Sequence, residues 1–135
     1  MNIVIDTNIF ISALIKDSKT REIIFKTNLN LLFPEFEFQE IFNHTDEILK
    51  KSKLKESELH SVLLGLLRKV KIIRVDKIIK YKKEADKIIG NIDKDDVIFI
   101  ATALAFNCPI WTDDNHFQKQ NRIKIIKTNE MIKFI

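Results

Sequence analysis

Residues 2–14 read NIVIDTNIFISAL, and this opening indicates the architecture of the chain. Ile3 to Ile5 is a short run of β-branched residues that Asp6 stops at once, which predicts a buried strand ending at a polar site. From Asn8 to Ile15 the apolar residues recur at helical spacing instead. A buried strand that passes directly into a helix is typical of α/β proteins.

The same alternation of strands and helices continues to the end of the chain. Short apolar runs predict further strands at residues 29–33, 71–75, 108–112 and 124–126. Apolar residues at helical spacing predict helices at residues 18–25, 35–51, 54–67, 76–89 and 93–106. Asp76 is the expected N-cap of the helix at 76–89, which Gly90 is expected to end, and Asp93 is the expected N-cap of the helix at 93–106. Gly65, inside the helix at 54–67, indicates close packing against a neighbouring element. About five strands alternating with helices predict a parallel, doubly wound sheet with helices on both faces, a three-layer α/β/α sandwich.

The composition is that of an ordinary globular protein. The 135 residues are 45% hydrophobic and 31% charged, so we expect one domain over residues 1–135 and exclude disordered chains. The single cysteine excludes an intramolecular disulfide. The N-terminus lacks the basic flank of a signal peptide, and the longest apolar stretch, Val97 to Phe106, is about half as long as a membrane span. We therefore expect a cytoplasmic protein without membrane contact.

Acidic side chains follow the predicted strands at the edge of the sheet where α/β proteins bind ligands. They are Asp6 after the first strand, Glu40 after the second, Asp96 early in the helix at 93–106, and Asp113 and Asp114 after the strand at 108–112. Carboxylates packed together repel one another, and a hard divalent cation relieves the repulsion. Mg²⁺ and Mn²⁺ prefer such oxygen ligands and also bind substrate phosphates. The two glycines are isolated, which excludes a glycine-rich phosphate loop and leaves a metal ion as the phosphate-binding group.

Each of these acids also has a purely structural interpretation. Asp6 and Asp93 have the positions of N-caps, and the helix dipole alone favours Asp96 in a first turn. The pair after the strand at 108–112 fits a turn in which the side chains bond the backbone. Glu40 fits a solvated helix face. Taken singly, none of these acids identifies a catalytic site.

Taken together, four segments resemble the motifs of PIN-domain ribonucleases. DTNIFISAL at residues 6–14 resembles the opening of that family, and Glu40 with Ile41, after Pro34, resembles its second acidic site. DKDDVIFIATAL at residues 93–104 resembles the third site, with an acid ahead of a helix of small residues. WTDDNHF at residues 111–117 resembles the fourth, a Thr-x-Asp element. The order of the motifs agrees, and they cover nearly the whole chain.

The resemblance implies an endoribonuclease that hydrolyses RNA phosphodiesters with Mg²⁺ or Mn²⁺ and an activated water. The carboxylates that would hold the metal and carry the catalysis are Asp6, Glu40, Asp96 and Asp114. Asn8 and Thr112 would orient these carboxylates and water, and Asp93 would be an auxiliary acid. The net charge of +4, from 23 Lys and Arg against 19 Asp and Glu, is compatible with a nucleic-acid partner.

The resemblance also bears on partners. Many members of the family are VapC-like toxins that form homodimers and are held inactive by a small antitoxin. An antitoxin and a second copy of the chain are therefore the protein partners that the resemblance implies. A cluster of Phe residues around the second predicted helix is most simply part of the core, but a partly exposed patch there would fit a second copy of the chain or a partner helix. The cluster comprises Phe33, Phe36, Phe38 and Phe42.

Two other functions fit the same residues. A non-catalytic PIN-like module would bind RNA or a partner protein without cleavage. A haloacid-dehalogenase-like phosphatase also begins with a strand and an acid, but its chemistry needs a second Asp two residues later, where this chain has Asn8. His116, two residues after Asp114, fits a turn better than it fits a metal ligand or a general base.

Overall fold

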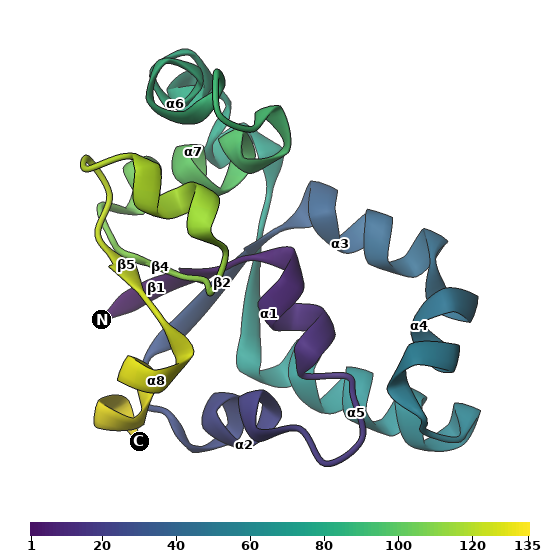
Figure 1. The fold of residues 1–135 in the computed structure, drawn as a ribbon. Coiled ribbons are helices and arrows are strands. Elements are labelled where there is room, and N and C mark those ends of the chain that lie inside the picture. Colours follow the sequence, from purple (N-terminus) through teal and green to yellow (C-terminus); the bar gives the residue numbers. More distant parts are fainter.

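Five parallel strands form one sheet, in the order β3-β2-β1-β4-β5, in the computed structural model, which describes residues 1–135 (Figure 1). The strands are β1 (Asn2–Ile5), β2 (Asn30–Pro34), β3 (Val70–Ile73), β4 (Ile110–Trp111) and β5 (Ile125–Ile126). In register, Ile3 lies beside Leu31 of β2, and Val4 lies beside Ile110 of β4. The parallel pairing of all neighbouring strands confirms the predicted doubly wound topology.

Helices connect the strands. The α-helices are α1 (Thr7–Ser12), α2 (Lys19–Lys26), α3 (Glu35–Asn43), α4 (Thr45–Ser52), α5 (Glu56–Lys69), α6 (Lys82–Ile89), α7 (Val97–Phe106) and α8 (Thr128–Met131). Short 3₁₀ helices occupy Val75–Lys77, Ile79–Tyr81, Lys94–Asp96, Asn115–Lys119 and Ile132–Phe134. None of the helices has the length and apolar character needed to cross a membrane.

The helices cover both faces of the sheet, as Figure 1 shows. α6 and α7 lie on one face, and α2, α5 and α8 lie on the other. α7 contacts β1, β2 and β4, and α6 packs on the outside of α7. α3 begins directly after β2, so its first residues lie at the carboxyl edge of the sheet. The arrangement confirms the predicted three-layer α/β/α sandwich.

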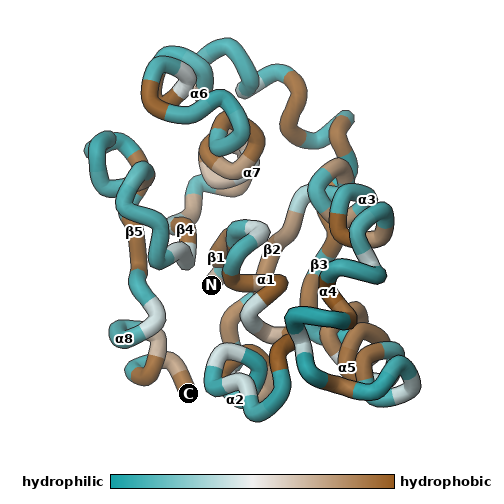
Figure 2. The backbone as a smooth tube through the Cα atoms, turned by 45° about the vertical axis from the view of Figure 1, so that its right-hand side comes forward, coloured by the Kyte–Doolittle hydropathy of each residue, from teal (hydrophilic) through white to brown (hydrophobic).

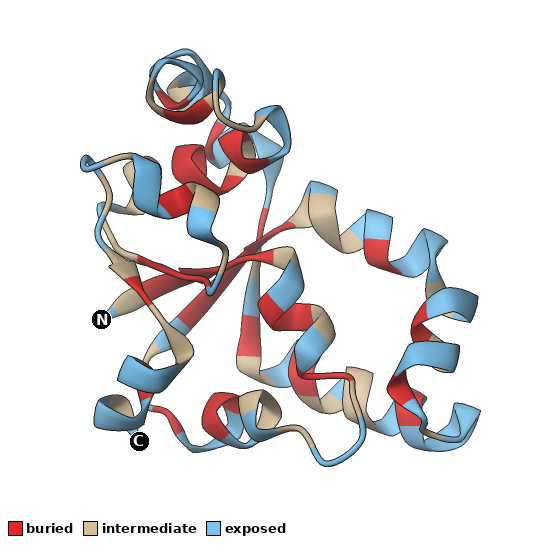
Figure 3. Ribbon diagram, in the orientation of Figure 1, coloured by how far each residue is buried: buried red, intermediate tan, exposed pale blue.

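The apolar pattern of the sequence accounts for these layers. Ile3, Val4 and Ile5 of β1 have no exposed surface, as expected for a central strand covered on both faces. α7 is apolar nearly all round (Figure 2), and most of its residues are buried. The buried residues lie on the strands and on the inward faces of the helices (Figure 3), where 31 of them form one hydrophobic core.

The structure corrects two predicted helices. The helix expected over residues 35–51 breaks at His44, whose φ of −115° and ψ of 27° separate α3 from α4. There the hydroxyl of Thr45 donates to the carbonyl of Phe42 at 2.6 Å, and such side-chain bonds compete with continuation of a helix. The prediction that Asp76 caps the helix at 76–89 was wrong. Its carboxylate lies 3.4 Å from Nε of Arg74, and α6 begins only after two 3₁₀ turns.

Both glycines are placed as the sequence predicts. A Cβ atom at Gly65 would lie 3.1 Å from Cζ of Phe25, so the missing side chain allows α5 to pack closely on α2. Gly90 ends α6, where an added Cβ would lie 2.5 Å from the carbonyl oxygen of Asp86. Close approach rather than an unusual backbone angle therefore requires glycine at these positions.

Candidate functional site

Two neighbouring strands place polar side chains at the same edge of the sheet. Asp6 directly follows β1, and Thr112 directly follows β4. The last residues of these strands, Ile5 and Trp111, lie beside each other, so the polar residues after them are also neighbours. The strand order changes direction between β1 and β4, and in open α/β sheets the crevice at such a point holds ligands.

The carboxylate of Asp6 is buried and held by two donors. The backbone N–H of Ile9 donates to Oδ1 at 2.8 Å, so Asp6 is the N-cap of α1, and the hydroxyl of Thr112 donates to Oδ2. Burial raises the pKa of Asp6 to about 6; the two hydrogen bonds oppose the shift, and the charges of Asp114 and Asp113 add to it. Asp6 is therefore both a helix cap and a carboxylate that is costly to ionise without a cation.

Asp113 and Asp114 have different partners. Asp113 accepts from the N–H and the hydroxyl of Thr128, at 2.9 and 2.6 Å, and so connects the end of β4 to α8. The N–H of Asp114 donates to the hydroxyl of Thr112 at 3.0 Å, and its Oδ1 accepts from the N–H of His116 at 2.9 Å. Of the two acids, Asp114 lies beside Asp6 and Thr112, whereas Asp113 has a structural role.

Asp96 has a buried oxygen atom without a hydrogen-bond partner. The residue directly precedes α7, and only 8% of its surface is exposed. Its Oδ2 makes no hydrogen bond, whereas buried polar atoms in folded proteins are nearly always bonded. Burial raises the pKa of Asp96 to about 7, the charges of Asp93 and Asp114 add to the shift, and His116 opposes it. Such an oxygen is suited to a positively charged ligand.

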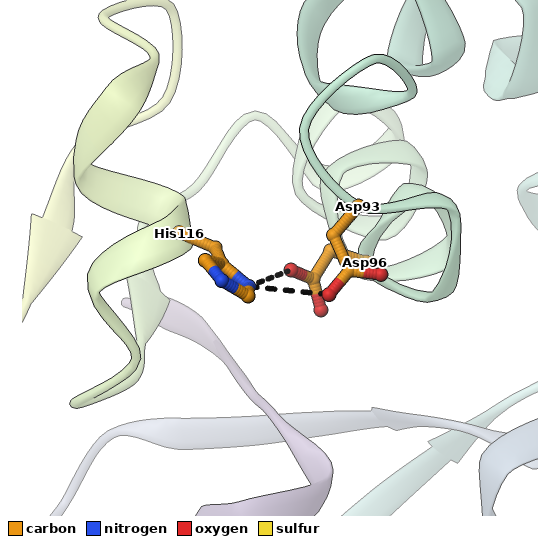
Figure 4. A group of neighbouring side chains, drawn as sticks. All are labelled: Asp93, Asp96 and His116. Carbon is orange, nitrogen blue, oxygen red and sulfur yellow. Dashed lines mark hydrogen bonds and ion pairs between the residues drawn. The ribbon is translucent and has the colours of Figure 1, made fainter.

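His116 lies beside Asp93 and Asp96 (Figure 4), and Asp114 is also close to it. Its Nδ1 is 3.2 Å from Oδ2 of Asp93, 3.5 Å from Oδ1 of Asp114 and 3.9 Å from Oδ2 of Asp96. Asp93 is an N-cap as predicted, but of the 3₁₀ helix Lys94–Asp96 that precedes α7 rather than of α7 itself: its Oδ1 accepts from the N–H of Asp95 at 2.9 Å. Ligand atoms of Asp93, Asp96 and His116 lie within 4.8 Å of one another, close enough to share a metal ion. The interpretation of His116 as a turn residue missed this contact, for which its position two residues after Asp114 was the available signal.

Helix α3 contributes two glutamates. Glu40, the predicted ligand, is exposed, and its Oε2 lies 3.7 Å from Nε2 of His44. Glu37 is more buried, and its Oε2 accepts from the hydroxyl of Thr7 at 3.2 Å. Burial raises the pKa of Glu37, and the charges of Glu40 and Asp95 add to the shift. Glu37 was not among the predicted ligands, although it lies one helical turn before Glu40.

Most of the acids described above line one open hollow of about 570 Å³, which we call the acidic pocket. Seven of its eleven lining residues carry a carboxylate and none is Lys or Arg; the acids are Asp6, Glu37, Glu40, Asp93, Asp95, Asp96 and Asp114. The pocket thus brings together the four predicted carboxylates, and Asn8 lines it as well, while Thr112 is buried behind Asp6. This set of oxygen donors, with the unpartnered oxygen of Asp96, fits a hard divalent cation such as Mg²⁺ or Mn²⁺.

Comparison with known proteins agrees with the fold. A family model described as PIN domain matches residues 4–132. Among solved structures, a similar chain occurs in the crystal structure of VapBC2 from Rickettsia felis bound to a DNA fragment from its promoter, with a TM-score of 0.67. That match covers 94% of this chain and 98% of the other at 20% sequence identity, so it shows a shared fold. No curated protein matches the sequence.

Proposed function

The chain belongs to the PIN domain family, and from this premise we propose that it is an endoribonuclease that hydrolyses RNA with Mg²⁺ or Mn²⁺. The observation that supports the proposal most directly is the buried, unpartnered Oδ2 of Asp96 in the acidic pocket. The closest basic group, Nδ1 of His116, lies 3.9 Å from this oxygen, beyond hydrogen-bond distance, and no Lys or Arg lines the pocket. A divalent cation is therefore the charge that would bond the oxygen directly and also bind a phosphate.

Four carboxylates would hold the cation: Asp6, Glu40, Asp96 and Asp114. When bound, the cation neutralises the charge of the phosphate and lowers the pKa of the attacking water. Asp6 and Asp96 are the most buried of the four, so their ionised forms depend most on a nearby positive charge. Glu40, on the exposed side of the pocket, would complete the ligand set where RNA enters.

Neighbouring side chains would orient these carboxylates. The two oxygens of Asp6 accept one hydrogen bond each, which fixes the carboxylate and leaves acceptor capacity for a cation. Thr112 would position Asp6, and Asn8, exposed on α1, would orient water or substrate. Asp93 would be an auxiliary acid, and its contact with His116, which lies beside Asp96 and Asp114, supports that role.

We further propose that the protein acts in the cytoplasm as the toxin of a toxin–antitoxin pair, as a homodimer inhibited by a small antitoxin. The support is the shared fold with a chain of VapBC2, together with the resemblance of the motifs to a family that includes many VapC-like toxins. Co-expression with the product of the neighbouring reading frame tests the proposal. Co-purification with loss of RNA cleavage is expected, and full cleavage in the presence of that product would contradict it.

Cleavage of a fluorescent single-stranded RNA tests the proposed activity. Protein treated with EDTA should be inactive and should regain activity with Mg²⁺ or Mn²⁺. Asp6→Asn should lower the rate by at least about 100-fold, because a lost ligand removes several kcal/mol of charge stabilisation, while the circular dichroism spectrum stays unchanged. A non-catalytic module would instead bind RNA in EDTA and cleave it under neither condition.

A further inference from the structure

A second hollow adjoins the acidic pocket. It has a volume of about 290 Å³, and we call it the apolar groove. It shares Phe36, Glu37 and Asp95 with the acidic pocket, so the two are continuous. The rest of its wall is mainly apolar and comes from α7 and the 3₁₀ turns before α6: Val75, Ile78, Ile79, Val97, Ile98 and Ala101. Its two basic residues are Lys82 and Lys94.

Phe36 is exposed at the point where the pocket and the groove meet. The ring of Phe38, two residues later, packs edge-on against Phe10 in the core, with centroids 6.0 Å apart. Phe36 is instead 53% exposed, and Ile79 in the same groove is 60% exposed. Large apolar side chains that remain exposed around a hollow are typical of a binding surface.

Lysines continue the path beyond the apolar groove. Lys82 lines the groove and also a third hollow on α6, where it is joined by Lys80, Lys83 and Lys87 and by one acid, Asp86. We call these four lysines the lysine patch. Figure 2 shows α6 as a largely hydrophilic helix outside the apolar helix α7. Positive charge therefore gathers at the end of the groove away from the acidic pocket.

We propose that a single RNA strand follows this path, with the scissile phosphate at the acidic pocket, adjacent bases in the apolar groove and the backbone beyond them on the lysine patch. The inference rests on the proposed function and adds the side of the molecule along which the substrate lies. Aromatic and apolar surfaces bind unpaired bases by stacking, with little dependence on sequence. Lysines bind phosphates through charge, as Lys82 and its neighbours would here.

The chemistry of the path favours a single strand over other ligands. A protein helix docks through a continuous apolar stripe, whereas this groove is bounded by acids at one end and by lysines at the other. A duplex keeps its bases stacked inside, where they cannot contact Phe36. A single strand presents bases and phosphates together, as the groove and the patch require.

Binding of a fluorescein-labelled single-stranded RNA, measured by anisotropy, tests the path. The measurements use an Asp6→Asn background, which should prevent cleavage. Phe36→Ala should weaken binding by about 10-fold, and Phe36→Tyr should restore it, because one stacking surface is lost and then regained. The double change Lys82→Gln with Lys83→Gln should weaken binding and reduce the slope of log affinity against log salt by about 1.4, since two phosphate contacts to a single strand are lost.

Matched control variants separate this path from general effects of charge or folding. Phe42 lies on the same helix and is 50% exposed, but it does not line the groove, so Phe42→Ala should bind RNA normally. Lys50→Gln with Lys51→Gln on α4 removes the same charge at a distance from the path and should also bind normally.

Cleavage by the wild-type protein with Mn²⁺ is measured in parallel, so the two proposals can fail separately. No cleavage at all would contradict the proposed function. If the wild type cleaves RNA but the Phe36 and Lys82 variants bind it as tightly as the controls, the path is wrong, and the groove is left for a protein partner. An equal loss of RNA affinity in the Phe36 and Lys82 variants and in the control variants would contradict the path as well.

Discussion

Thr112 donates a hydrogen bond to Asp6 across the junction of β4 and β1, although 106 positions separate the two residues in the sequence. The same hydroxyl accepts from the backbone N–H of Asp114 at 3.0 Å. One uncharged side chain therefore fixes the positions of two residues of the acidic pocket. The hydroxyl is fully buried, so water cannot replace it in either hydrogen bond.

Replacing this hydroxyl should lower activity more than it affects the fold. Thr112→Val should reduce kcat by about 10- to 100-fold, as expected when a group that orients metal ligands is lost. The buried carboxylate of Asp6 and the part-buried N–H of Asp114 each lose a partner, so the free energy of unfolding should fall by about 1–3 kcal/mol. Thr112→Ser keeps the hydroxyl, so it should retain most of the wild-type kcat and most of the wild-type free energy of unfolding. The measurements are RNA cleavage with Mn²⁺ and urea denaturation.

A second buried threonine provides the control. Thr102 in α7 is also fully buried, but its hydroxyl donates to the carbonyl of Ile98 at 2.7 Å within the same helix. Thr102→Val should therefore leave kcat unchanged. A Thr112→Val enzyme with the wild-type kcat would show that the hydrogen bond to Asp6 has no part in catalysis.

The metal-free protein should become less stable as the pH rises. The pKa of Asp6 is about 6 and that of Asp96 about 7, both above the ordinary value of 3.8. At pH values between 3.8 and these raised pKa values, the folded state binds more protons than the unfolded state. The free energy of unfolding therefore falls from about pH 4 to about pH 7. The loss is on the order of a few kcal/mol. Urea denaturation in EDTA across this range measures it.

The variant Asp96→Asn isolates the contribution of Asp96 to this pH dependence of stability. The amide has no charge to bury, so the variant should lose less stability over the same pH range, and at about pH 7 it should be more stable than the metal-free wild type. Mn²⁺ should remove most of the pH dependence of the wild type, because the cation stabilises the ionised carboxylates. Parallel curves for the two metal-free proteins would show that Asp96 does not titrate as described.

Substitution of Asp113 should lower stability, whereas substitution of the adjacent Asp114 should lower Mn²⁺ affinity. Asp113→Ala removes two hydrogen bonds to Thr128 and should cost about 1 kcal/mol of stability while leaving Mn²⁺ affinity unchanged. Asp114→Asn keeps the shape of a helix cap but removes a carboxylate from the pocket, so it should weaken Mn²⁺ binding with little change in stability. Thermal denaturation and calorimetric titration distinguish the two. The reverse pattern would exchange their assigned roles.

Much of the fold was predictable because its decisive segments are locally unambiguous. Ile3 to Ile5 is a short β-branched run, and the segment from Val97 to Phe106 is too long and too apolar for anything but a buried helix. The break at His44 was not predictable, because neither glycine nor proline marks it and it coincides with a hydrogen bond from Thr45 to Phe42. The helical spacing of the apolar residues continues through the break, so it predicts a single helix.

The candidate site was predictable only in part, because some of its contacts depend on how distant elements pack. Asp6, Asp96 and Asp114 lie at strand and helix ends, and parallel topology brings such ends to one edge of the sheet. Spacing along the sequence hints at Glu37, one helical turn before Glu40, and at His116, two residues after Asp114. Their contacts, however, depend on how α3 and the 3₁₀ turn at 115–119 pack in the folded chain. The missing partner of Asp96 Oδ2 is likewise a property of the folded chain alone.

Isothermal titration of metal-free protein with Mn²⁺ at about neutral pH measures whether the acidic pocket holds a divalent cation, as we propose. We predict saturable binding to the wild type and at least about 10-fold weaker binding to Asp96→Asn, whose fold is checked by circular dichroism. Absence of saturable binding to the wild type, or equal affinity in the two proteins, would contradict the claim.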